Sequence, residues 1–110
     1  MDIVARLIEL KPDSDARVED WAKFLREHRA EAIDTLRNEG VHIESWFGLT
    51  LEGKQYLLCY MRSDSQTKAE AVASQSSSVV DAYHQQFKVD TWVRGRGVFA
   101  ELLVDLTAER

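Results

Sequence analysis

The sequence predicts an α+β fold with the element order β-α-β-β-α-β, in which four strands form one antiparallel sheet and two helices cover one of its faces. Segments rich in β-branched and large apolar residues alternate with polar segments whose apolar residues recur every three or four positions. A short connection containing glycine joins the second and third strand segments, as in a hairpin. The expected strands are residues 2–10, 41–51, 55–62 and 98–106, and the expected helices lie within residues 13–38 and 68–87.

The first strand is apolar and too short for a typical helix, and it ends before Pro12, which breaks regular structure. Residues 13–38 then predict one long amphipathic helix, because their apolar residues fall on a single face. This face contains Val18, Trp21, Ala22, Leu25, Ala32, Ile33 and Leu36. Polar residues 13–15 suit the start of the helix, and Gly40 suits its end.

Residues 41–51 alternate between two faces, as expected of a strand. One face would carry Val41, Ile43, Ser45, Phe47 and Leu49, and the other His42, Glu44, Trp46 and Gly48. Gly53 lies in the turn that leads to residues 55–62, so these two strands should form an antiparallel hairpin.

The second helical segment is interrupted by Ser76, Ser77 and Ser78, which disfavour a continuous helix. Ser78 can cap a new helix, so we expect this helix to be split or bent near the serines. Residues 94–97, Arg-Gly-Arg-Gly, are expected to form a flexible loop before the fourth strand.

The first and third strands are apolar on both faces, although two helices cover only one face of a sheet. An uncovered apolar face would exceed the patch size usual for a monomer. We therefore expect a homodimer in which the sheets of two copies pack face to face.

Length, net charge, cysteine content and the first ten residues disfavour nucleic-acid-binding, disulfide-linked and secreted classes of protein. The chain has 110 residues, which fits a single domain over residues 1–110, and its formal net charge is −5, which disfavours a nucleic-acid partner. The single cysteine, Cys59, cannot form an internal disulfide, and the first ten residues lack the pattern of a signal peptide. We expect a cytoplasmic protein that does not bind membranes.

Residues 24–64 resemble the domain of unknown function numbered 6176 (DUF6176), a family of bacterial proteins in the dimeric α+β barrel superfamily. The resemblance rests on the pattern EHR-x-E-x-x-x-T-L-x-x-E-G, the strand V-x-I-E-S-x-F and the strand YLLCYM, and it extends to SVVDAYHQQF at residues 78–87. It implies a ferredoxin-like protomer and a dimer. The wider superfamily includes cofactor-independent monooxygenases, haem-degrading enzymes, sugar mutarotases and stress-response proteins, so the fold leaves the chemistry open.

Arg29 is the most informative charged residue, since the helical wheel places it within the apolar face of the first helix. An enclosed guanidinium needs a carboxylate, for which Glu44, Glu9 and Asp81 are candidates. The residue is then either a structural cation, paired or reaching water at its tip, or a clamp for an anionic ligand.

His28 and His84 flank the apolar faces of their helices, and Asp81 lies one helical turn before His84, where it can orient the ring. His84 and His28 are candidate general acids or bases, although a histidine bonded only to structure is the commoner case. Tyr60 is a candidate hydroxyl donor, with aromatic packing as the alternative.

No ligand spacing typical of a metal site and no nucleotide-binding motif occurs, so we expect neither a metal nor a cofactor. We expect Cys59 to be a buried, inert thiol.

Three hypotheses about function remain. The protein binds a small polar or anionic metabolite, with Arg29 as the charge partner. It is instead a cofactor-free oxygenase or sugar isomerase, with His84 exchanging a proton and Asp81 fixing its tautomer. Or it is a structural dimer without a ligand.

Overall fold

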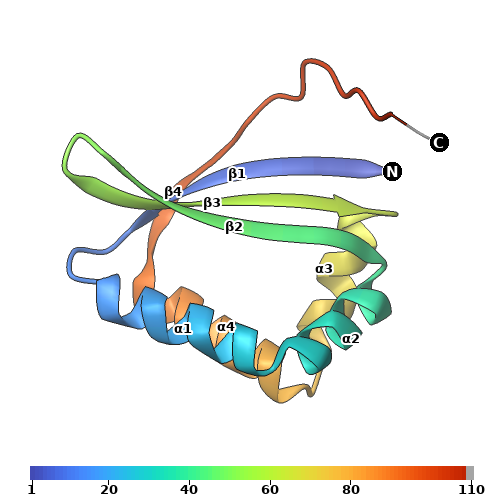
Figure 1. Cartoon of the computed structure of the whole chain (residues 1–110), viewed down its shortest axis with the longest axis horizontal. Helices are drawn as coiled ribbons and strands as arrows, with labels where there is room; N and C mark the ends of the chain where they lie inside the picture. Colours follow the sequence, from blue (N-terminus) through green and yellow to red (C-terminus); the bar gives the residue numbers. More distant parts are fainter. Residues whose placement is uncertain (109–110) are drawn as a thin grey trace.

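The computed structural model describes residues 1–108, which form one antiparallel sheet with four helices on one of its faces (Figure 1). The predicted α+β class is confirmed, with each of the two expected helices divided into two. In chain order the elements are β1 (Asp2–Leu10), α1 (Asp15–Glu27), α2 (Arg29–Glu39), β2 (Val41–Leu51), β3 (Lys54–Ser63), α3 (Gln66–Ser74), α4 (Val79–Thr91) and β4 (Trp92–Phe99).

The strand order in the sheet is β2-β3-β1-β4, and every neighbouring pair is antiparallel. The two central strands place Ile8 opposite Leu57, and both side chains are almost fully buried under the helices. A core cluster forms where this face meets α1 and α4, and it consists of Leu10, Trp21, Leu57 and Phe87. The Trp21 and Phe87 rings stack with their centroids 4.5 Å apart, so the two helices meet through aromatic contact.

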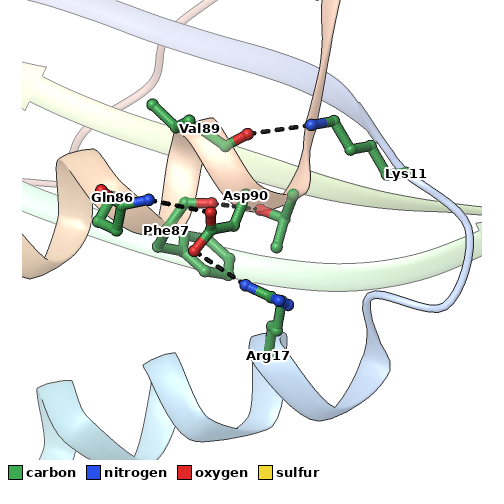
Figure 2. A network of polar contacts seen from close by, with 7 residues as sticks. Lys11, Arg17, Gln86, Phe87, Val89 and Asp90 are labelled. Atoms are coloured by element: carbon green, nitrogen blue, oxygen red, sulfur yellow. Dashed lines mark hydrogen bonds and ion pairs between the residues drawn. The ribbon is translucent and has the colours of Figure 1, made fainter.

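Polar contacts fix the C-terminal end of α4 against the start of α1 (Figure 2). Asp90 forms an ion pair with Arg17 of α1, at 2.9 Å, and accepts a hydrogen bond from Gln86, at 3.0 Å. Lys11, in the loop before α1, donates to the carbonyl oxygen of Val89 at 3.0 Å. The contacts of Arg17 and Lys11 thus join the end of α4 to α1 and to the loop that precedes it.

The prediction of one helix over residues 13–38 is wrong, because the backbone leaves the helical conformation at His28, with φ −109° and ψ 34°. The His28 ring stacks on Phe24 at 4.1 Å, and its Nδ1 donates to the Phe24 carbonyl oxygen at 2.9 Å. This local arrangement ends α1, and α2 begins at the next residue. The expected break in the second helix is confirmed: Ser78 Oγ accepts from the Val80 amide at 3.1 Å and caps α4.

The fourth strand also differs from the prediction. It spans Trp92–Phe99 and so contains the four residues expected to form a loop, whereas residues 100–108 form no regular element. Gly97 lies opposite Ile8, and a Cβ at this position would come within 2.6 Å of Arg6 Nη2. Gly95, at φ 72°, accompanies an irregularity in the pairing of β1 with β4. These glycines therefore serve a close approach and a bulge within the strand, where the sequence pattern alone suggests a loop.

The C-terminal segment lies on the side of the sheet opposite the helices, a face called here the helix-free face (Figure 1). Phe47 is 52% exposed and Val98 is 61% exposed on this face. Asp105 of the C-terminal segment forms an ion pair with Arg62 at 2.5 Å, while Leu103 and Leu106 remain almost fully exposed. Among the described residues, no helix has the length and apolar character needed to cross a membrane.

Candidate functional site

A cavity of about 780 Å³ lies between the helices and the sheet, a size in the range of small-molecule sites. Its floor comes from the sheet, including Ile8, Trp46 and Cys59, and its walls come from all four helices, including Leu25 and Ile33. Charged residues converge on this largely apolar space. They are Arg6, Arg26, Arg29, Arg37, Glu39, Glu44, Glu70, Asp81 and Lys88.

Four of the six residues singled out from the sequence line this cavity: Arg29, Glu44, Asp81 and His84. The other two lie elsewhere. His28 sits at the break between α1 and α2 and is bound to Phe24. Tyr60 follows the buried Cys59 on β3, so it points to the helix-free face, where its hydroxyl accepts a hydrogen bond from Arg62 Nε.

Arg29 is exposed rather than enclosed in the core. The sequence places Arg29 on the apolar face only if residues 13–38 form one continuous helix. The break at His28 moves Arg29 out of the apolar face of α1. It lies at the border of the cavity, and no carboxylate of residues 1–108 lies within ion-pair distance of it. The expectation that a buried acid compensates Arg29 is therefore wrong.

His84 is held by Trp21 of α1, whose indole Nε1 donates to His84 Nδ1 at 3.1 Å. An indole N–H only donates, so Nδ1 is the acceptor and the neutral ring carries its proton on Nε2. Burial, followed by the positive charge of Lys88, lowers the pKa of His84 to about 3. No hydrogen bond links Asp81 to His84 within the described chain, so Trp21 takes the tautomer-fixing role expected of Asp81. At neutral pH, His84 is an uncharged hydrogen-bond donor.

Glu44 is positioned by its strand neighbour Trp46, whose Nε1 donates to Oε2 at 2.8 Å. Both side chains face the helices, because β2 pairs Glu44 with Met61 and Trp46 with Cys59 on the covered side of β3. Burial raises the pKa of Glu44, although the Trp46 bond and the charge of Lys88 oppose this effect. The carboxyl group is thus a stronger base than an exposed glutamate.

Two further carboxyl groups, those of Glu39 and Asp81, line the cavity together with Glu44 and interact with it electrostatically. Burial, together with the charges of Asp81 and Glu44, raises the pKa of Glu39 to about 7. At neutral pH this part of the cavity therefore holds fewer negative charges than its three acidic residues suggest.

A second group of charges, which the sequence analysis missed, lies around Trp92. The guanidinium of Arg6 stands 5.2 Å from the centre of the Trp92 ring, and Lys88 Nζ stands 5.0 Å from it. Arg6 Nε is buried without a hydrogen-bond partner, and burial lowers the pKa of Lys88. Neither cation has an ion-pair partner within 4.0 Å among residues 1–108. The sequence feature that could have revealed this group is Arg6, a charged residue on the same face of an apolar strand as Val4 and Ile8.

Metal binding and thiol chemistry have less support in this site. In residues 1–108, no three His, Cys, Asp or Glu side chains are grouped so that they could hold a metal ion. Cys59 is buried, and burial raises the pKa of its thiol to about 12, so it stays protonated and unreactive at neutral pH.

Comparisons with known proteins place the chain in a family. A search of curated proteins finds no match. Among solved structures, the chain is similar to one titled "Putative antibiotic biosynthesis monooxygenase from Nitrosomonas europaea". The match has a TM-score of 0.58 and 13% sequence identity, and it covers 94% of this chain and 100% of the other. This likeness shows a shared ferredoxin-like fold. The family model of DUF6176, a family of unknown function, matches residues 1–110, and the chain therefore belongs to that family.

Proposed function

We propose that this protein binds a small organic anion in the cavity between its helices and its sheet. The observation that supports this most is the pair of cations at Trp92, neither of which has an ion-pair partner within 4.0 Å among residues 1–108. Arg6 Nε is buried without a partner, and the same side chain lines the cavity, where a carboxylate of a ligand would pair with the guanidinium. Arg29, at the border of the cavity, would add to the attraction.

The ligand would carry polar groups at two ends. Its acidic group would meet Arg6 and Lys88, and a carbonyl or hydroxyl group would meet Glu44 and His84. The apolar and aromatic walls between these ends suit a short carbon chain or a ring.

Calorimetric titration with 2-oxobutanoate, 2-oxoglutarate and 3-phenylpropanoate tests the proposal. At least one should bind, and Arg6→Gln should weaken that binding about 10- to 100-fold, as expected for losing a charged hydrogen bond. Arg94→Gln is the matched control, because Arg94 is exposed on β4 and does not line the cavity. Absence of binding by all three acids at millimolar concentration, or equal affinity in Arg6→Gln, would refute the proposal.

The proposed functional unit is a cytoplasmic homodimer that pairs through the helix-free face. Support comes from the exposed Phe47 and Val98 on this face and from the exposed Leu103 and Leu106 of the C-terminal segment. Light scattering after size exclusion tests this. Twice the mass of one chain is expected at micromolar concentration, with Phe47→Glu shifting the population toward one copy.

A further inference from the structure

Glu44 and His84 share one structural support, a group of three aromatic residues that we call the indole cluster: Trp21, Trp46 and Phe87. The Trp46 ring centre lies 5.5 Å from that of His84 and 5.2 Å from that of Trp21, and both pairs meet edge to face. The Trp21 and Phe87 rings stack face to face. Through Trp46, the cluster holds both the β2 carboxyl group, on the floor of the cavity, and the α4 imidazole, on its wall.

Each of the two groups uses one polar atom to bind the cluster and keeps the other free. Glu44 Oε2 accepts from Trp46, and Oε1 has no protein partner within the described residues. His84 Nδ1 accepts from Trp21, and Nε2–H likewise has none. The free atoms are complementary, since one accepts a proton and the other only donates a hydrogen bond.

A fixed base beside a fixed neutral donor is the arrangement that removes a proton from a carbon next to a carbonyl group. The base takes the proton while the donor binds the oxygen on which negative charge develops. The cations at Trp92 meanwhile suit a carboxylate on the same small molecule. A 2-oxo carboxylate carries all three features: an acidic C–H, a ketone and a carboxylate.

We infer that Glu44 and His84 catalyse the enolisation of 2-oxo carboxylates held by Arg6 and Lys88. This inference rests on the proposed function, because it requires the anion to be bound in the cavity.

The step balances without an oxidant or cofactor. Glu44 Oε1 forms a bond to the proton on C3, and the electrons of the C–H bond become the C2–C3 double bond. The former carbonyl electrons move to the oxygen, which accepts a hydrogen bond from His84 Nε2–H. Return of a proton from Glu44 to C3 restores the ketone. In D₂O, Glu44 exchanges its proton with solvent and returns a deuteron instead.

Hydrogen–deuterium exchange at C3 of 2-oxobutanoate, 2-oxoglutarate and phenylpyruvate, followed by proton NMR in D₂O, tests the inference. The protein should accelerate exchange of at least one acid above the rate in buffer. Glu44→Gln should reduce this acceleration at least 100-fold while 3-phenylpropanoate, which lacks the ketone, still binds. Glu31→Gln, an exposed α2 position outside the cavity, is the control and should exchange like the unchanged protein.

His84→Gln separates the role of the donor from that of the base. It should slow exchange while the C3 proton still transfers to Glu44, so that the residual rate keeps its dependence on Glu44.

The outcomes separate the two proposals. If no acid binds, the proposed function fails. If an acid binds but exchanges at the rate in buffer, or if exchange survives in Glu44→Gln, the enolisation is refuted while anion binding stands. Circular dichroism and urea unfolding of each variant show whether the fold is intact, and Glu44→Asp provides a second variant that keeps the charge and should retain part of the exchange.

Discussion

Acidification should destabilise this protein through His84, and the size of the effect follows from the burial of its ring. The pKa of His84 is about 3 in the folded chain, against an ordinary value of 6.5. Between these values the unfolded chain binds a proton at this position and the folded chain does not. Stability is therefore unaffected above pH 6.5 and is lost progressively as the pH falls below it.

The magnitude follows from 1.36 kcal/mol for each pH unit below the unfolded pKa. Between pH 7 and pH 5 the loss is about 2 kcal/mol, which is a large part of the total stability of a domain of this size. Urea unfolding at both pH values, of the unchanged chain and of His84→Gln, measures this loss. The unchanged chain should lose about 2 kcal/mol more than the variant.

Comparing the two proteins cancels the contributions of the other charged groups that line the cavity. These groups include Lys88 and Asp81 on α4, Glu44 on β2 and Glu39 on α2. Nitrogen NMR gives an independent readout, since it should show a neutral ring with its proton on Nε2 throughout pH 5–8. Equal losses in both proteins, or a ring that titrates near pH 6.5, would refute the reasoning.

Three further substitutions test other parts of the structure. The pKa of Glu39 is raised to about 7, so the folded chain loses stability as the pH rises from 4.5 to 7. In urea unfolding, Glu39→Gln should therefore be about 1 kcal/mol more stable than the unchanged chain at pH 8 and should differ little from it at pH 5. Gly97→Ala would place its Cβ 2.6 Å from Arg6 Nη2 and push the end of this flexible side chain aside, so it should cost about 1 kcal/mol or less in urea unfolding and weaken carboxylate binding in calorimetry. Ser78→Ala removes the cap on the Val80 amide and should cost about 1 kcal/mol, measured by urea unfolding, while carboxylate affinity stays unchanged.

The order of elements was predictable because it depends on local periodicity. The alternation of side chains in β2 and the hairpin at Gly53 follow from residues that are close together in the sequence. The same holds for the helix caps at Ser78 and Gly40. The helix break at His28 was not predictable in this way. The apolar spacing continues across it, so the pattern gives no sign of the change in backbone conformation at His28.

The candidate site was predictable in part, for a related reason. Glu44 and His84 carry recognisable chemistry, and their elements bring them to the covered side of the sheet. Their partners are Trp46 and Trp21, and the bond between Trp21 and His84 joins α1 to α4 across 63 positions of the chain. Sequence spacing offered Asp81 as the partner of His84 because it is near in the helix. The three-dimensional packing selected an indole from another helix.

The buried charges and the backbone irregularities of this fold lie at the same cavity between the helices and the sheet. Arg6 places a charge on the covered face of an apolar central strand, and Gly97 leaves a gap in β4 that the Arg6 guanidinium fills. Glu44 turns a carboxyl group toward the same interior, and the break at His28 frees Arg29 to border it. Each feature costs stability or regularity when considered alone, and such violations concentrate at functional sites in natural proteins. A purely structural dimer would gain nothing from an unpaired guanidinium and a desolvated carboxyl group beneath its helices. Their convergence on one cavity thus favours a ligand-binding role over a structural one, independently of the identity of the ligand.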